Sequence, residues 1–191
     1  MAPGEPVLVC QECGHRQPFV RLPLFALTGP SGVGKSTVGR LLTAELGGRV
    51  VVLEQDVLWT AGLRDPDDDY AAFRSTWLRM AGMIHQSGRP VVLCGTVVPV
   101  QLERRPERVF VGDIHYFGLV CEPGVLRERL SARPAWREWD GPRIDDMLRF
   151  NDWLRANGPR LHPPVELLDT TTLPLADTVR AVATWISRAG C

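Results

Sequence analysis

A glycine-rich loop between an apolar run and a segment of helical period constrains the fold more than any other feature of this sequence. The loop reads Gly-Pro-Ser-Gly-Val-Gly-Lys-Ser over residues 29–36. Glycines allow backbone N–H groups to converge on phosphate oxygens, and the amides at the start of the next helix add to the attraction for an anion. Residues 24–28 supply the apolar strand before the loop, and residues 35–46 supply the helix after it. The sequence therefore predicts a phosphate-binding loop in a strand–loop–helix unit.

This loop predicts specific contacts with a nucleoside triphosphate. We expect the Lys35 ammonium to reach the β- and γ-phosphates of ATP, and the Ser36 hydroxyl to bind the Mg²⁺ ion that bridges them. ATP and Mg²⁺ are therefore the expected cofactors. The expected nucleotide-binding residues of the loop are Gly29, Pro30, Ser31, Gly32, Val33, Gly34, Lys35, Ser36 and Thr37.

Apolar runs of strand length alternate with segments of helical period along the chain. Buried strands separated by helices are typical of a parallel sheet, so the pattern predicts an α/β sandwich with helices on both faces of a five-stranded sheet. With 191 residues, the chain suits one such domain, expected over residues 22–191 after an extension at residues 1–21. Residues 127–153 break the alternation. The apolar runs are residues 24–28, 50–54, 91–94, 117–121 and 165–169.

The composition argues against several classes of partner. Lysine and arginine number 22, as do aspartate and glutamate, so no overall charge would attract an extended nucleic acid. The longest apolar stretches are far shorter than the roughly 20 residues that span a membrane, and no secretory pattern opens the sequence. The 5 cysteines suit a reduced compartment better than a disulfide framework. We therefore expect a cytoplasmic protein, and the sequence leaves its oligomeric state open.

Two carboxylates follow the second apolar run, at the sheet edge where ligands bind in open α/β sheets. Asp56 is the expected general base, which orients or deprotonates the attacking hydroxyl. Glu54 is the expected metal helper, which holds a water on Mg²⁺. The alternative is that both carboxylates cap the following helix or are simply solvated.

An arginine-rich segment follows the fourth apolar run. Arginines near a transferred phosphoryl group stabilise its charge in the transition state, and a mobile segment that carries them also excludes water. Arg133 and Arg137 are the expected catalytic pair, because Pro134 should end the preceding helix and leave both at a flexible junction. Arg127 and Arg129 are expected to make ordinary contacts on a helix surface.

The acceptor pocket is expected at the same sheet edge. Aromatic rings beside arginines suit a polar ring such as a nucleoside, a sugar or an aromatic antibiotic. Asp113 and His115, which precede the fourth apolar run, are further candidates for this pocket, whereas Trp77 belongs to the core face of a helix. The expected substrate-binding residues are Asp56, Trp59, Arg64, Phe73, Arg74 and Thr96.

These motifs together resemble the nucleoside and small-molecule kinases of the adenylate-kinase-like group, which includes shikimate, gluconate and chloramphenicol phosphotransferase-like enzymes. The motifs are the loop at residues 29–36, the acidic end of the second strand and the arginine-rich segment, and the resemblance covers about residues 22–188. It implies a P-loop sandwich with strand order 2-3-1-4-5. It also implies a lid over ATP near residues 131–142.

The resemblance also implies roles for individual residues. By similarity, Asp56 matches the acid of the second strand, Arg133 and Arg137 match lid arginines, and Thr170 lies in a loop that borders the adenine. The third strand departs from the group, because residues 91–96 contain no aspartate or glutamate where many such proteins place a second magnesium carboxylate. Metal binding should therefore depend more on the loop serine and the second strand.

A pair of cysteines in the extension suggests half of a zinc site. Cys10 and Cys13 are separated by two residues and followed by a glycine, as in one knuckle of a zinc ribbon. Tetrahedral zinc needs four ligands, and only His15 is nearby, so a site would have to recruit a distant residue or a second subunit. The alternative is a hairpin-like extension without metal.

The combined pattern predicts an ATP-dependent phosphotransferase that moves the γ-phosphate to a hydroxyl of a small molecule. Two alternatives stay open. A nucleic-acid 5′-end kinase would use the same chemistry, but it needs a basic groove and a salt-dependent affinity that the balanced charge does not favour. A nucleotide-binding regulatory or switch protein would bind ATP without a small-molecule acceptor. Turnover of ATP with a range of acceptors separates these possibilities.

Overall fold

The computed structural model describes residues 6–134, 136 and 139–190, which contain two separate sheets. The larger is a five-stranded sheet with the order β4-β5-β3-β6-β7, in which every neighbouring pair is parallel. Counted along the chain from β3, this order is 2-3-1-4-5, so the expected topology is confirmed. The five strands are β3 (Leu24–Thr28), β4 (Val51–Glu54), β5 (Val91–Cys94), β6 (Ile114–Val120) and β7 (Val165–Asp169).

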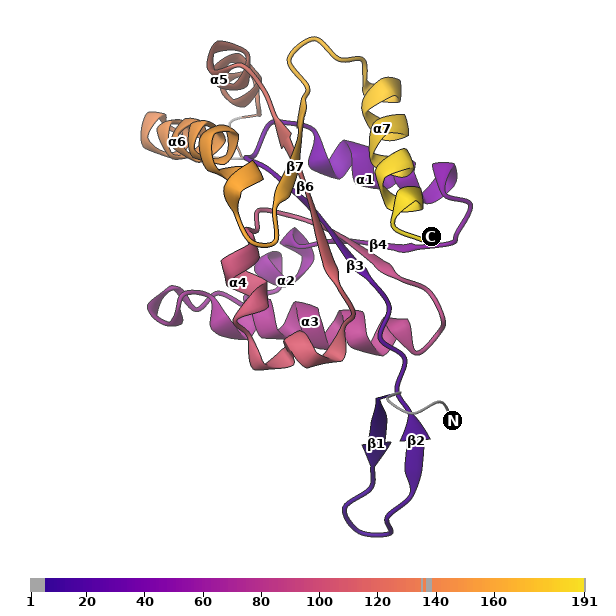
Figure 1. Cartoon of the computed structure of the whole chain (residues 1–191). Helices are drawn as coiled ribbons and strands as arrows, with labels where there is room; N and C mark the ends of the chain where they lie inside the picture. Colours follow the sequence, from indigo (N-terminus) through magenta and orange to yellow (C-terminus); the bar gives the residue numbers. More distant parts are fainter. Residues whose placement is uncertain (1–5, 135, 137–138, 191) are drawn as a thin grey trace.

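Helices cover both faces of this sheet, which confirms the predicted sandwich (Figure 1). Helices α1 and α7 lie on one face, and α3 lies on the other. No helix in the described part of the chain combines the length and the apolar character needed to cross a membrane. The helices are α1 (Lys35–Glu45), α2 (Asp56–Thr60), α3 (Ala71–His85), α4 (Pro99–Glu103), α5 (Pro123–Ser131), α6 (Gly141–Asn157) and α7 (Leu175–Arg188), with short 3₁₀ turns η1 (Pro66–Asp68), η2 (Pro106–Phe110) and η4 (Gly158–Arg160).

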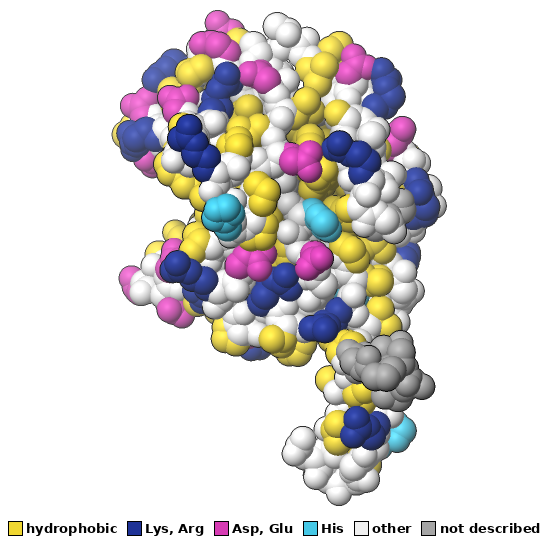
Figure 2. All heavy atoms as spheres, in the orientation of Figure 1, with side chains coloured by type: hydrophobic (Ala, Val, Ile, Leu, Met, Phe, Trp, Pro, Cys, Tyr) yellow, Lys and Arg dark blue, Asp and Glu magenta, His cyan; other side chains and the backbone are white. Residues whose placement is uncertain are grey.

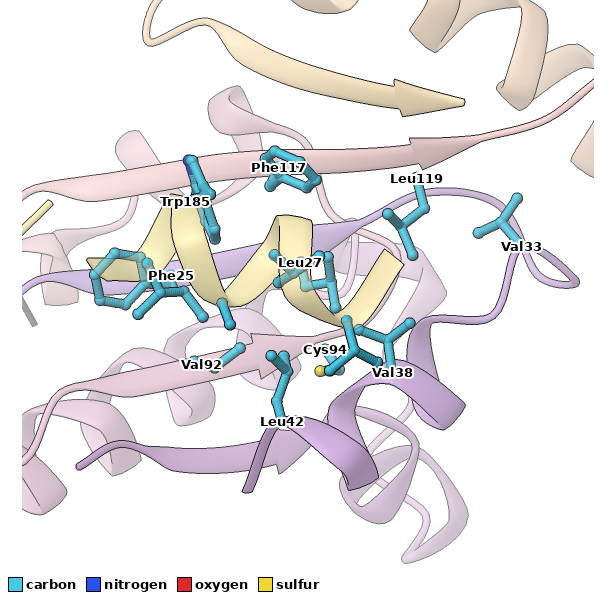
Figure 3. Close-up of a cluster of buried hydrophobic side chains, with 14 of the residues drawn as sticks. Phe25, Leu27, Val33, Val38, Leu42, Val92, Cys94, Phe117, Leu119 and Trp185 are labelled. Atoms are coloured by element: carbon cyan, nitrogen blue, oxygen red, sulfur yellow. The ribbon is translucent and has the colours of Figure 1, made fainter. Parts of the chain in front are cut away.

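Side chains of the central strand alternate between two cores. Phe25 and Leu27 pack with α1 and α7, whereas Leu24 and Ala26 pack with α3. Figure 3 shows the first of these cores, in which Trp185 of α7 lies against the ring of Phe25. Because successive residues of a strand point to opposite faces, a short apolar run fills both layers of the sandwich. The central strand therefore holds the phosphate loop on a rigid base.

The fourth strand of the sheet begins three residues earlier than its apolar run suggests. β6 starts at Ile114 rather than at residue 117, and His115 lies within it, with its ring stacked 5.4 Å from that of Phe25. Asp113 is exposed and precedes the strand. Both residues therefore lie at the amino end of β6, roughly 20 Å from the carboxyl edge at about 3.3 Å per residue. The prediction that Asp113 and His115 face the acceptor pocket is wrong.

Residues 127–153 do not break the helical pattern as the sequence suggested. They include the end of α5 and most of α6, a helix of 17 residues. Asp140 caps α6, since its side chain accepts a hydrogen bond from the Arg143 amide. The helix was missed because it buries only Ile144, Asn151 and Leu154, and an asparagine interrupts its apolar stripe. Ser131 ends α5 before Pro134, as expected.

The first residues form an antiparallel hairpin that stands apart from the body of the molecule (Figure 1). Its strands are β1 (Val7–Val9) and β2 (Arg16–Pro18). The chain after β2 is held to the end of α3 by Gln86, whose side-chain amide accepts from the Val20 amide at 3.0 Å and donates to the Val20 carbonyl at 2.9 Å. A hairpin-like extension is therefore what the structure contains.

His85, at the end of α3, gives the fold a pH-dependent stability. It is 0% exposed, and burial lowers its pKa to about 4. Its Nδ1 accepts a hydrogen bond from the Leu22 amide at 3.3 Å, which requires the neutral ring. Since an unfolded histidine titrates near pH 6.5, the unfolded chain gains a proton below that pH before the folded chain does.

We expect urea unfolding to show that the free energy of unfolding falls by roughly 2 kcal/mol between pH 7 and pH 5, and that His85→Leu lacks this fall. Equal losses in both proteins would contradict this role.

Candidate active site

Two glycines determine the path of the phosphate loop. Gly29 has φ of 136°, and a Cβ atom there would lie 2.2 Å from the carbonyl oxygen of Leu119 in β6. Gly34, with φ of 101°, precedes the first residue of α1. Both conformations are strained for any residue with a side chain. The loop therefore packs tightly against β6 and turns directly into the helix, as the motif predicted.

Lys35 is buried beneath the loop and is the electrostatic centre of the site. Its Nζ donates to the carbonyl oxygens of Gly29 at 2.7 Å and Pro30 at 2.9 Å. Burial lowers its pKa to about 8, although the charges of Glu54 and Asp56 act in the opposite direction. The structure thus brings the two expected carboxylates of the second strand close to the loop lysine.

Ser36 and Glu54 lie close together at the end of the loop. The Ser36 hydroxyl partly offsets the rise in the Glu54 pKa that burial causes. The charge of Asp56, the first residue of α2, raises that pKa further. Asp56 itself is exposed. The arrangement sets a hydroxyl and two carboxylates around the end of the loop, and these are the oxygen donors that Mg²⁺ prefers.

Threonines at three strand ends support the loop. Thr96 donates from its Oγ1 to the Gly29 carbonyl at 3.2 Å, which places this expected acceptor-site residue beside the phosphate loop. Thr28 is fully buried and donates to the Val97 carbonyl at 2.5 Å, a contact that the sequence did not suggest. Thr170 is also buried, and its hydroxyl donates to the Val120 carbonyl at 3.1 Å. These contacts tie the end of β3 to the segment after β5, and the end of β7 to the end of β6.

Arg133, which the sequence predicts to be a lid residue, lies over an aromatic ring. Its guanidinium carbon is 5.2 Å from the ring centroid of Trp139, and Arg143 lies 4.8 Å from the same centroid. The charge of Arg133 contributes to the lowered pKa of Lys35, so the two cations are close. Arg137 lies outside the described residues.

The other arginines of this segment have different surroundings. Arg127 forms an exposed ion pair with Asp145 of α6 at 2.8 Å, as expected for a surface contact. Arg129 is half-buried and donates to the carbonyl oxygens of Thr170 at 3.0 Å and Thr171 at 3.3 Å. The prediction of an ordinary surface contact is therefore wrong for Arg129, which ties α5 to the loop after β7. Because α6 begins at Gly141, the segment between helices is also shorter than residues 131–142.

Aromatic side chains of α2 and of the start of α3 form a cluster after the two carboxylates. The ring of Trp59 lies 5.1 Å from that of Tyr70 and 5.8 Å from that of Phe73, measured between centroids. Arg64 lies over the Trp59 ring at 5.2 Å. Arg74, with a side chain only 9% exposed, forms an ion pair with Asp69 at 2.6 Å. Since Trp59 lies three residues after Asp56, both are on the same side of α2.

The surface in this region is hollowed. Figure 2 shows a recess between the surface over α6 and the segment that joins α2 to α3, with acidic and basic side chains interspersed around it. A separate cavity of about 490 Å³ lies between the hairpin and the end of α3, lined by Leu8, Phe19, Arg79, Gly82, Met83, Gln86, Pro106, Glu107 and Phe110. It opens at the amino ends of the strands, so it is not part of this site.

Some residues near the site were not identified from the sequence, because their roles depend on tertiary contacts. The Ser31 amide of the loop donates to the Met147 sulfur at 3.4 Å, which brings α6 onto the phosphate loop. Gln55, between the two carboxylates, is buried and fills the space beside Gly95. Asn151 is fully buried in α6. An asparagine among the apolar positions of a helix is a sequence signal for the last of these, because such a residue needs a hydrogen-bond partner.

The possible zinc site in the hairpin is not supported. Cys10 and Cys13 are both exposed and free. Across the described residues, no group of three or more histidine, cysteine, aspartate or glutamate side chains is arranged to hold a metal ion. Two sulfur atoms alone leave the tetrahedral ligand set incomplete.

Comparisons with known proteins identify relatives of most of the chain. The sequence matches the AAA domain family over residues 26–144. It is 43% identical over 176 residues to a shikimate kinase from Chlorobaculum tepidum, an alignment that covers 86% of this chain and 91% of that protein. A solved gluconokinase from Sinorhizobium meliloti 1021 has a TM-score of 0.58 at 22% identity, with 87% and 92% of the two chains covered. A shikimate kinase from Acinetobacter baumannii in complex with shikimate has a TM-score of 0.56 at 19% identity, with 88% and 95% covered.

The fold, the phosphate loop and these relatives lead to the same assignment. The two solved structures share the architecture, and the curated relative shares both length and sequence. The buried lysine and the adjoining serine and carboxylates are the parts that phosphoryl transfer requires. The chain therefore belongs to the P-loop small-molecule kinases, with an AAA domain over residues 26–144, and is an ATP-dependent phosphotransferase.

Proposed function

We propose that this kinase moves the γ-phosphate of ATP to a hydroxyl of a small polar ring molecule, such as a nucleoside, a sugar or an antibiotic-like compound. The observation that carries the proposal is the meeting of Lys35, Glu54 and Asp56 at the end of the phosphate loop, beside an aromatic group on α2 and α3. A cation that binds phosphate, a metal-binding carboxylate and an accessible base are then within one site. The kinase domain in this proposal is residues 22–191, and the hairpin is an appendage.

In the proposed mechanism, Lys35 leaves the carbonyls of Gly29 and Pro30 and bonds to the phosphates of ATP, where its charge offsets theirs. The backbone amides of the loop orient the triphosphate. Ser36 and Glu54 would hold Mg²⁺, since both offer oxygen atoms and are already in contact. When bound, this ion offsets negative charge on the phosphate oxygens during transfer.

Asp56 accepts the proton of the attacking hydroxyl in this proposal. It is the exposed carboxylate of the pair, whereas Glu54 is half-buried and lies close to Ser36. A base must approach the acceptor, and a metal-binding carboxylate must face the loop. The difference in exposure therefore supports the division of roles between the two residues.

The acceptor is proposed to lie against Trp59, in the recess between α6 and the segment that joins α2 to α3 (Figure 2). Trp59 and Arg64 offer an aromatic face and a cation, which suit a polar ring. Phe73 and Arg74 are buried, so they support the aromatic group from beneath. Thr96 contacts the phosphate loop and is proposed to line the end of the acceptor site that is nearest to the phosphates of ATP.

The decisive experiment measures ATP turnover with a library of nucleosides, sugars and antibiotics. The library also includes shikimate, because the relative from Chlorobaculum tepidum is named a shikimate kinase. Product identification by mass spectrometry should show one phosphate added to a hydroxyl of one acceptor class. Binding of ATP with no turnover of any acceptor would favour a nucleotide-binding switch protein, and selective labelling of oligonucleotide 5′-ends would favour an end kinase.

Arg133 is proposed to stabilise transition-state charge from the lid. We expect Arg133→Ala to lower kcat by about 10²-fold with a smaller effect on ATP affinity, because such groups act mainly in the transition state. Arg127→Ala, which removes an equal charge from the surface of α5, is the matched control and should leave kcat unchanged. A loss of ATP affinity with no loss of kcat in the Arg133 variant would make it a docking residue. Arg137 is proposed for the same role and is tested in the same way.

A further inference from the structure

A fully buried asparagine in the middle of α6 pairs with the backbone at the carboxyl end of β6. Asn151 is 0% exposed. Its Nδ2 donates to the Cys121 carbonyl at 2.9 Å, and its Oδ1 accepts from the Cys121 amide at 3.1 Å. Nδ2 also donates to Asp152 Oδ1 at 3.3 Å. A side-chain amide has both a donor and an acceptor group, so it matches the N–H and C=O groups of one residue.

Cys121 needs this partner because the sheet ends there. The Val120 carbonyl still accepts from the Thr170 amide, at 2.7 Å, in continuation of the β6–β7 pairing. Cys121 follows, is 0% exposed, and precedes Glu122, the cap of α5. Backbone groups left unpaired in such a place are costly. Asn151 satisfies them and thereby ties α6 to the point where β6 passes into α5.

The same side of α6 leads from this tie to the phosphate loop. Arg143, Met147 and Asn151 are spaced by four residues, which places them along one stripe of the helix. Met147 accepts the hydrogen bond from the Ser31 amide of the loop at 3.4 Å. Arg143 lies against the Trp139 ring, which Arg133 also contacts. Residues of this stripe therefore contact the end of β6, the phosphate loop and Trp139, which lies just before α6.

We propose that Asn151 is a positioning residue for phosphoryl transfer, which fixes α6 so that Met147 meets the phosphate loop and Trp139 holds Arg133 near Lys35. Asn151 acts through these residues and does not touch ATP or the acceptor. The proposal rests on the catalytic role proposed for Arg133. A displacement of about 1 Å in groups around a reacting centre costs up to 10²-fold in rate, so a loosened helix should be visible in kcat.

The first test compares two variants of α6. Asn151→Leu keeps the size of the side chain and removes the pair with Cys121, and kcat should fall roughly 10- to 100-fold with little change in the KM for ATP. Leu154→Ala is the matched control, because Leu154 is 0% exposed on the same helix but packs into the core on the side of α3. It should lower Tm while kcat of the folded protein stays within about twofold of wild type. Equal kcat losses at temperatures where both are folded would reduce Asn151 to a stabilising residue and overturn the proposal.

Two further measurements test whether Asn151 acts through Arg133 and through its paired contact with Cys121. In an Arg133→Ala background, Asn151→Leu should lower kcat by a clearly smaller factor than it does in the wild type, because one of the two groups that it positions is already gone. Full additivity of the two losses would overturn the proposed route through the lid. Asn151→Asp should recover activity as the pH is lowered, because a buried carboxyl is protonated more readily and then again offers a donor and an acceptor. No recovery in a folded protein would contradict the paired contact.

Hydrogen exchange tests the inference without any acceptor. Asn151→Leu should speed exchange of the Ser31 amide and of the amides in the first turns of α6, and Leu154→Ala should leave the Ser31 amide unchanged. Unchanged exchange at Ser31 in Asn151→Leu would overturn the proposal even if no substrate were known. If wild type and Arg133→Ala instead showed the same kcat, the role of Arg133 would fail while the exchange result still decided the positioning of α6.

Discussion

Replacement of Lys35 by alanine should abolish phosphate transfer, with kcat lowered by roughly 10³-fold or more, and should weaken ATP binding. The reason is that Lys35 is the cation beneath the loop, and its Nζ already bonds to two loop carbonyls within reach of the phosphates. Turnover with an identified acceptor measures the first effect, and calorimetric titration with ATP measures the second. The fold should survive, because the two hydrophobic cores on the faces of the sheet do not include Lys35.

The pH dependence of ATP binding provides a second measure of the same residue. Burial lowers the Lys35 pKa to about 8 in the absence of nucleotide, so the free protein loses this charge as the pH rises through that value. ATP affinity of the wild type should therefore weaken above about pH 8, and Lys35→Ala should lack this step. Arg180→Ala, which removes one positive charge from the surface of α7, is the control and should keep it. Near-normal turnover by a folded Lys35→Ala protein would refute the assignment of the loop.

Replacement of Asp56 by asparagine should lower kcat by roughly 10²- to 10⁴-fold, the usual worth of general-base catalysis, while ATP and acceptor still bind. Asparagine keeps the size of the side chain and removes the basic oxygen at the start of α2. Steady-state kinetics with the acceptor found in the library measures the effect. Asp113→Asn is the matched control, since Asp113 precedes β6 at the opposite edge of the sheet and should leave kcat unchanged.

A companion variant separates the two carboxylates. Glu54→Gln weakens the contact with Ser36, so it should raise the Mg²⁺ concentration needed for half-maximal activity more than it lowers the maximal rate. An unchanged kcat in Asp56→Asn together with a complete loss in Glu54→Gln would exchange the two roles. If neither substitution mattered, the acceptor would be activated elsewhere, although the positioning of phosphates by the loop would still make the protein a kinase.

Much of the fold could be read from local patterns. The runs that became β3, β5 and β7 begin and end at the predicted residues. β3 and β5 are buried at every position, and a proline before each strand and a glycine after it mark its ends. The start of β6 was misplaced because Ile114, His115 and Tyr116 mix an apolar residue with two that carry polar groups. Helix α6 was missed for a related reason, since it covers the end of the sheet with few apolar side chains.

The sequence by itself determined the phosphate loop, the five strands and the candidate carboxylates, because glycine spacing, strand length and helix period are properties of neighbouring residues. The strand order was implied by the resemblance to a known kinase group and not by these local patterns. Only the tertiary structure decided which of these groups meet. It brought Ser36 near Glu54 and Arg133 near Lys35, and it removed Asp113 from the site. It also paired Asn151 with Cys121, 30 residues earlier in the chain. Such contacts depend on how whole layers pack, and packing brings together residues whose separation along the chain carries no periodic signal.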